Sequence, residues 1–160
     1  MPPHGICVRR ATIRDLDKVT TLRLALLREH PDHPIYGRLR PDVSARARTL
    51  YTTQLRSTSE SIFLADCDGE IAGILRCVES MGSPLMEPER YTYVSSVFVR
   101  PEYRRRGVLR ALVGEAERWS RERGIDQIRL HNVAGSEGAE GAWSALGFQV
   151  VEQVRVRTFR

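Results

Sequence analysis

Residues 97–113 read VFVRPEYRRRGVLRALV, and this stretch carries the strongest signal in the chain. An apolar, β-branched run ends at a proline, three consecutive arginines and a glycine follow, and an amphipathic helix begins after the glycine. The first N–H groups of a helix have no partner inside the helix, and the helix dipole puts partial positive charge at the same end. With the guanidinium groups of Arg104, Arg105 and Arg106 close by, this loop is suited to holding a diphosphate. We therefore expect it to bind a phosphate-bearing cofactor.

The size and composition of the chain are those of an ordinary globular domain. Its 160 residues, 41% hydrophobic and 28% charged, suit one compact domain over residues 1–160. No apolar run approaches the roughly 18 residues of a membrane span, and the N-terminus lacks the charged-then-apolar pattern of a signal peptide. We expect a cytoplasmic protein with no membrane partner.

The charge and cysteine patterns argue against a nucleic-acid site and against a metal site. The net charge is +5, but acidic residues are interleaved with the arginines and no aromatic-basic stripe occurs. We therefore expect no nucleic-acid partner. Cys7, Cys67 and Cys77 lack metal-ligand spacing, so we expect reduced thiols and no metal site.

Hydrophobic periodicity predicts a mixed α/β fold, with helices packed on the faces of a mixed sheet. The expected order is β-α-α-β-β-β-α-β-α-β-β. The elements are strand 6–8, a helix from Thr12 to about residue 30, helix 43–56, strands 62–65 and 71–75, strand 91–99, a helix from 108 to about 123, strand 127–132, helix 137–146, and strands 148–151 and 154–159.

A second signature follows the arginine loop by about thirty residues. It is a small residue, Ala139, and then Trp143, four residues before Gly147-Phe148. Together with Val99-Arg100-Pro101-Glu102-Tyr103 and Arg104-Arg105-Arg106-Gly107-Val108-Leu109, it resembles the GNAT superfamily of N-acyltransferases, which use acetyl-CoA. The resemblance covers nearly the whole chain, in the element order of that family.

The resemblance implies how acetyl-CoA is held. The strand through Val97, Phe98 and Val99 splays from its neighbour, and its backbone groups pair with the pantetheine amides. Backbone N–H groups from Arg105 to Arg110 wrap the pyrophosphate, and a backbone N–H near Val97 or Val99 polarises the acetyl carbonyl. The expected cofactor-binding residues are Val97, Phe98, Val99, Arg104, Arg105, Arg106, Gly107, Val108, Leu109, Arg110, Ser136 and Trp143.

The chain departs from the family pattern at four positions. Leu109 stands where Gly or Ala is usual, and Ser136 where an asparagine often contacts the cofactor. Ser95 stands where many members carry a glutamate on the central strand, and we expect it to position a water molecule. Trp143 replaces the tyrosine that often protonates the departing thiolate, and an indole N–H has no acid character near neutral pH.

The expected reaction is direct attack of a neutral amine on the thioester, so the ammonium group must first lose a proton. His131 is the candidate base, because an imidazole titrates near neutrality and this position holds a catalytic glutamate in some members. The alternative reading of His131 is a strand residue with no chemical role.

Two functions remain open at this stage. One is an acetyl-CoA-dependent N-acetyltransferase acting on a small-molecule or peptide amine, and the other is a catalytically weak acyl-CoA-binding module of the same fold. Glu29, His30 and His33 lie where the family forms a wall of the acceptor pocket. The tyrosines that are candidates to line that pocket are Tyr36, Tyr51, Tyr91 and Tyr93, and packing in the core or across strands is the alternative role for each. Tyr93 is expected to share a strand face with Ser95 and Val97. The acceptor and any preference for a longer acyl group are not specified by a motif, and the C-terminal strands 148–159 suggest a homodimer.

Overall fold

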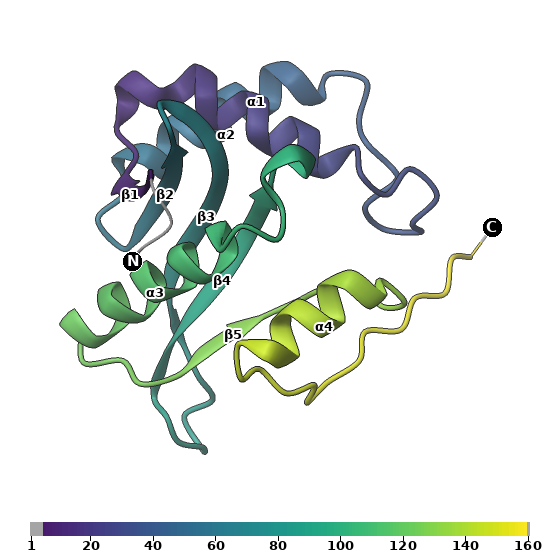
Figure 1. Ribbon diagram of the computed structural model, residues 1–160. Coiled ribbons are helices and arrows are strands. Elements are labelled where there is room, and N and C mark those ends of the chain that lie inside the picture. Colours follow the sequence, from purple (N-terminus) through teal and green to yellow (C-terminus); the bar gives the residue numbers. More distant parts are fainter. Residues whose placement is uncertain (1–4, 160) are drawn as a thin grey trace.

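The computed structural model describes residues 5–159 and shows a five-stranded mixed sheet in the order β1-β2-β3-β4-β5 (Figure 1). The strands are β1 (Ile6–Arg10), β2 (Glu60–Cys67), β3 (Glu70–Met81), β4 (Arg90–Val99) and β5 (Ile128–Leu130). The helices are α1 (Leu16–Leu27), α2 (Val43–Arg56), α3 (Val108–Glu122) and α4 (Glu137–Ala145), with short 3-10 turns at Ile13–Asp15 and Pro101–Tyr103. Strands β1 to β4 pair antiparallel, and β5 pairs parallel with β4. The predicted mixed α/β class is confirmed.

Helices cover both faces of the sheet, as Figure 1 shows, with α1 and α2 on one side and α3 on the other. On the first face Val19 and Leu22 of α1 pack against Leu64 and Ile74 of the sheet. On the second face Leu112, Ala116 and Trp119 of α3 pack against β2 and β3, and the Trp119 indole N–H donates to Ser61 Oγ at 2.9 Å. The side chains of each central strand therefore point alternately into two apolar layers. This explains why β2 is buried almost throughout.

Helix α3 approaches β3 closely at Gly73. A Cβ atom at Gly73 would lie 3.1 Å from the Phe98 carbonyl oxygen and 3.1 Å from Val108 Cγ1. The glycine therefore lets the start of α3 lie directly on the sheet, which fixes the position of the arginine loop beside β4.

Strand β4 is irregular at the point where the resemblance places the splay. Its register with β3 shifts between Ile74 and Arg76, and Ser96 has a left-handed backbone with φ 55°. This β-bulge reverses the alternation of side chains beyond it. The expectation that Val97 shares a face with Tyr93 and Ser95 is therefore wrong, because Val97 packs in the core on the α3 side.

The two C-terminal strands expected at 148–151 and 154–159 do not form. Residues after α4 have no regular secondary structure, and Val150, Val151, Val154 and Phe159 are each 70% exposed or more. Figure 1 shows this segment running away from β5 on the far side of α4. Alternating apolar residues predict a strand only where a neighbouring edge supplies hydrogen bonds, and within the described residues no strand pairs with this segment.

A buried carboxylate lies immediately before the first residue of α1. Asp15 is 6% exposed, and its two oxygens accept hydrogen bonds from the Arg9 guanidinium at 2.8 and 2.9 Å. One of these oxygens also accepts from the backbone N–H of Thr12 at 2.8 Å. These bonds favour the charged carboxylate, chiefly through Arg9, and lower the pKa of Asp15 to about 2.

We expect Asp15→Asn to lower the free energy of unfolding by about 2 kcal/mol at pH 7. The folded-state pKa of Asp15 is depressed, so its stabilisation is present above the ordinary pKa of 3.8 and is lost as the pH falls toward 2. Urea unfolding of both proteins at pH 7 and pH 3 measures the difference, which should shrink at the lower pH. Asp17→Asn is the matched control, because the Asp17 side chain is 84% exposed. An equal loss at both pH values would contradict the assigned role of the Asp15 charge.

Candidate functional site

One large cleft runs along β4 and past the start of α3, and we call it the β4–β5 cleft. Its volume is about 1030 Å³, and its walls come from the end of α1, β4, the arginine loop, the first turn of α3, residues 130–133 and α4. The expected cofactor and catalytic residues all line it except Arg106. The guanidinium of Arg106 instead lies over the Tyr103 ring, 5.7 Å from its centroid.

The end of the cleft at α3 is built by the backbone. Gly107 begins the helix with a left-handed φ of 87°, and Arg105 before it is also left-handed at φ 62°. Val108, Leu109 and Arg110 line the cleft in the first turn, where helix N–H groups have no intrahelical partner. These donors, with the positive end of the helix dipole, make this end of the cleft an anion site.

Arg104 ties this anion site to two other parts of the fold. Its Nε donates to the Val99 carbonyl at 2.9 Å, and its terminal nitrogen donates to Glu29 Oε1 at 2.6 Å. The guanidinium thus links the end of β4 to the residues that follow α1. The sequence suggested Arg104 as an anion ligand, but its side chain already bonds to Val99 and Glu29. Arg105 and Arg110 also line the cleft, and within residues 5–159 neither guanidinium has a partner.

The middle of the cleft lies where β4 and β5 separate. The last residue pair between these parallel strands is Val94 with Leu130, so Ser95 and His131 are the first residues past the pairing on their respective strands. From Ser95 to Val99 no strand among residues 5–159 pairs with the edge of β4 that faces β5. Sequence reasoning chose both Ser95 and His131, and the structure brings them to the same opening.

The hydroxyl of Ser95 is held by a buried ion pair. Arg76 donates to Ser95 Oγ at 3.2 Å and to Glu60 at 2.9 Å, and the side chains of Arg76 and Glu60 are 17% and 10% exposed. The side chain at position 95 is therefore a hydroxyl and not a carboxylate, and the guanidinium of Arg76 binds it. Ser95 keeps one hydroxyl hydrogen to donate into the cleft.

His131 forms a pair with Tyr93. The Tyr93 hydroxyl lies 2.8 Å from His131 Nδ1, and the two rings meet edge to face at 5.5 Å. Burial raises the pKa of Tyr93, so this phenol stays uncharged near neutral pH. The sequence did not reveal this pair, because it depends on the register between β4 and β5. Tyr93 lies opposite Arg129, and its hydroxyl reaches His131, the first residue after β5.

The loop after α1 forms the outer wall of the cleft. His33 Nδ1 accepts hydrogen bonds from the backbone N–H groups of Ile35 and Tyr36, at 3.1 and 3.0 Å, and the His33 ring stacks on Tyr36 at 4.6 Å. Glu29, His30 and Tyr36 line the cleft, whereas His33 supports it from outside. Of the three residues that the resemblance placed in the acceptor wall, Glu29 and His30 thus line the cleft and His33 does not.

Helix α4 closes the opposite wall. Ser136 is its N-cap, and both Ser136 and Trp143 line the cleft. The Trp143 ring packs edge to face on Phe148 at 5.3 Å, which anchors the helix to the chain that follows it.

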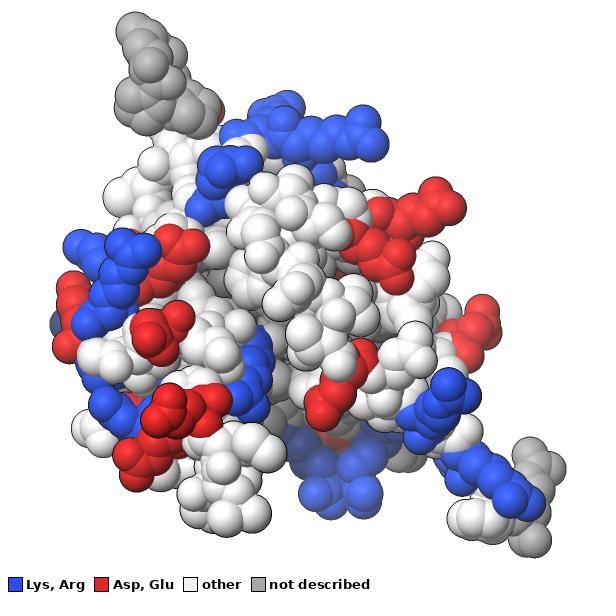
Figure 2. All heavy atoms as spheres, turned by 90° about the horizontal axis from the view of Figure 1, so that it is seen from below, with Lys and Arg blue, Asp and Glu red and all other residues white. Residues whose placement is uncertain are grey.

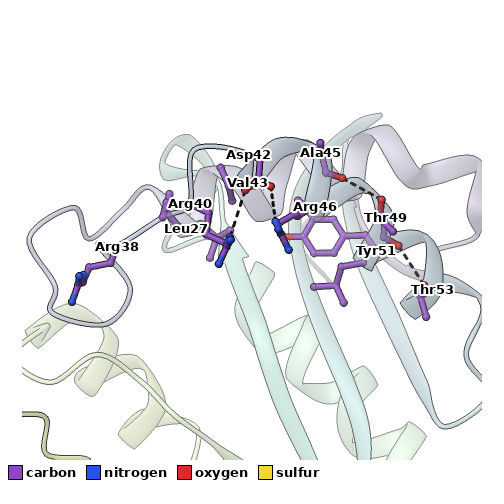
Figure 3. Close-up of a pocket in the computed structure, with 13 residues that line it drawn as sticks. Leu27, Arg38, Arg40, Asp42, Val43, Ala45, Arg46, Thr49, Tyr51 and Thr53 are labelled. Carbon is purple, nitrogen blue, oxygen red and sulfur yellow. Dashed lines mark hydrogen bonds and ion pairs between the residues drawn. The ribbon is translucent and has the colours of Figure 1, made fainter. Parts of the chain in front are cut away.

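A second hollow of about 820 Å³ lies on the outer surface of α2 (Figure 3). Arg40 and Arg46 pair with Asp42 there, and Thr49 and Thr53 bond to the helix backbone. None of the expected cofactor or catalytic residues lines this hollow, so the β4–β5 cleft is the candidate active site.

Other kinds of site find no support in the part of the chain that the structure describes. Among residues 5–159 no three His, Cys, Asp or Glu side chains are grouped as metal ligands, and no helix has the length and apolarity needed to cross a bilayer. Acidic and basic side chains are interspersed on the face shown in Figure 2.

Comparison with known proteins agrees with this geometry. The sequence model of the acetyltransferase (GNAT) family matches residues 24–148. An uncharacterized N-acetyltransferase of Methanocaldococcus jannaschii is 25% identical over 109 residues, which are 68% of this chain and 48% of that protein. This chain therefore spans about half the length of that relative.

Solved structures show the same fold. A predicted acetyltransferase from Clostridium acetobutylicum, solved with acetyl-CoA, superposes with a TM-score of 0.77 at 17% identity, covering 95% of this chain and 96% of that one. An aminoglycoside N-acetyltransferase in complex with CoA also gives a TM-score of 0.77, at 21% identity, covering 100% and 99% of the two chains.

Proposed function

The chain belongs to the acetyltransferase (GNAT) family, and from this premise we propose that it transfers the acetyl group of acetyl-CoA to a primary amine in the β4–β5 cleft. One observation carries the proposal. The free N–H groups at the start of α3 and the unpaired edge of β4 line one continuous cleft that reaches Ser95 and His131.

The residues of this cleft fit acetyl-CoA. The first turn of α3 offers backbone donors to a diphosphate, and Gly107 leaves open space there, since a Cβ on it would meet no atom within 4 Å. The free edge of β4 from Ser95 to Val99 offers backbone groups to an extended chain bearing amides. Arg105 and Arg110 add positive charge for the phosphates.

His131 is the proposed base. For this role its Nδ1–H donates to the Tyr93 oxygen, which leaves the lone pair of Nε2 free to take a proton from the amine. The thioester supplies an activated acyl carbon, to which the amine nitrogen bonds as the carbon–sulfur bond breaks. The thiolate then takes a proton from solvent, because Trp143 offers no acidic proton.

The second candidate function is acyl-CoA binding without turnover. It is favoured by Ser95, whose hydroxyl is bound by Arg76 in a place where many family members carry a glutamate. Release of free thiol from acetyl-CoA, measured with a panel of primary amines, separates the two functions. Amine-dependent release with a matching amide product supports the enzyme. Tight acetyl-CoA binding with no release between pH 6 and 9 would support the binding module.

We expect His131→Ala to lower kcat at pH 7 by about 100-fold, as general-base loss commonly does, with little change in the KM for acetyl-CoA. The rate of the variant should depend more steeply on pH than that of the wild type, because the ammonium group must then lose its proton to solvent before it attacks. Arg129→Ala is the matched control on β5, since Arg129 lies over the Tyr91 ring and does not line the cleft. An unaltered pH profile in His131→Ala would remove His131 as the base.

We expect Gly107→Ala to weaken CoA binding by about tenfold, because a left-handed backbone costs an L-residue roughly 1–2 kcal/mol and the loop must shift to avoid it. Isothermal titration calorimetry with CoA measures the change. Gly114→Ala is the control, since this glycine also faces open space in α3 but lies in the middle of the helix. Equal affinity of the two variants would argue against the diphosphate site at Gly107.

A further inference from the structure

We infer that the acceptor is a primary amine with a flat aromatic or apolar body and no second positive charge. The inference rests on the proposed acetyl transfer and concerns the part of the β4–β5 cleft that faces α1. Two features carry it: the aromatic side chains that wall this part of the cleft, and the state of the carboxylates around it.

The aromatic wall is rigid before any ligand binds. Tyr36 lines the cleft, and the loop that carries it is held by the two hydrogen bonds to His33 Nδ1 and by the stacked His33 ring. Tyr36 is itself 44% exposed, so part of its ring is available to a ligand. A preformed ring surface favours flat apolar groups, because little side-chain entropy is lost on binding.

The other sides of this region are also aromatic or apolar. Tyr93 and His131 lie edge to face on the sheet side, and Leu26 and Leu27 line the cleft from the end of α1. A ligand body in this region therefore contacts rings and aliphatic side chains on several sides, while its amine reaches the opening at Ser95 and His131.

The carboxylates near this region are already neutralised. Of the described residues that line the cleft, only Glu29 is acidic, and it is bound to Arg104 at 2.6 Å. Behind Ser95, Glu60 is bound to Arg76.

A further cation lies close to that buried pair. Arg23 is 8% exposed, and it bonds to the Gln54 amide and lies over the Tyr51 ring rather than pairing with a carboxylate. Among the described residues, no carboxylate without a guanidinium partner therefore lines the cleft. A second ammonium on the acceptor would lose hydration there without gaining a carboxylate, and binding should suffer accordingly.

The decisive measurement is calorimetric titration of the CoA-saturated protein with three amines. The amines are 2-phenylethylamine, n-butylamine and 1,4-diaminobutane. We expect 2-phenylethylamine to bind about tenfold more tightly than n-butylamine, as aromatic contacts allow. We expect n-butylamine to bind at least as tightly as 1,4-diaminobutane, which differs from it by the second amine.

Variants at Tyr36 test the aromatic wall directly. Tyr36→Ala should reduce the affinity for 2-phenylethylamine about tenfold and leave n-butylamine and CoA almost unchanged, while Tyr36→Phe should retain the wild-type affinities. Tyr91→Ala is the control, because Tyr91 lies under Arg129 and does not line the cleft.

Tighter binding of 1,4-diaminobutane than of n-butylamine would overturn the inference. Failure of 2-phenylethylamine to bind the CoA-loaded protein would also overturn it, and so would an unchanged affinity of Tyr36→Ala for 2-phenylethylamine.

The proposed function is decided separately by thiol release. Acetylation of 1,4-diaminobutane in preference to the other amines would therefore refute the acceptor class and leave the acetyltransferase intact. Binding of 2-phenylethylamine with no thiol release would contradict acetyl transfer and leave the preference of the cleft for an aromatic amine intact.

Discussion

The β4–β5 cleft opens because two parallel strands separate after three residue pairs. Strands β4 and β5 pair from Thr92 to Val94, and beyond Leu130 they diverge. A strand edge without a partner exposes N–H and C=O groups that must find hydrogen bonds elsewhere. In the β4–β5 cleft this edge is covered by a helix on each side and is open at the middle, so it is suited to pair with a ligand rather than with another strand.

Two features keep the strands apart and the cleft aligned. The bulge at Ser96 redirects β4 as it leaves the pairing, with a left-handed residue and a shifted register. The Arg104 guanidinium then links the Val99 carbonyl to Glu29, so hydrogen bonds connect the end of β4, the arginine loop and the residues just after α1. The anion site at α3 and the opening at His131 are therefore held in fixed relation, which positioning of a donor and an acceptor requires.

Each of the two polar side chains at the opening, Ser95 and His131, is held by a neighbouring side chain. His131 is oriented by Tyr93, and Ser95 by the buried Arg76–Glu60 pair. The phenol of Tyr93 is neutral beside the imidazole, and the guanidinium of Arg76 beside Ser95 is paired with the Glu60 carboxylate. Both pairs therefore hold a polar side chain at the opening without adding net charge.

The sequence by itself determined the helices and strands whose apolar residues recur at regular spacing, and it determined the residues of the arginine loop. Helix 43–56, the strands predicted at 62–65 and 71–75 and the loop-to-helix transition at Gly107 all follow from local patterns, because apolar faces and helix starts are encoded by neighbouring residues. The tertiary structure alone decided the Ser96 bulge, the Tyr93–His131 pair and the unpaired state of residues 149–159. Each of these depends on the register of one strand against another or on the presence of a partner edge, and a single strand's alternation contains no information about either.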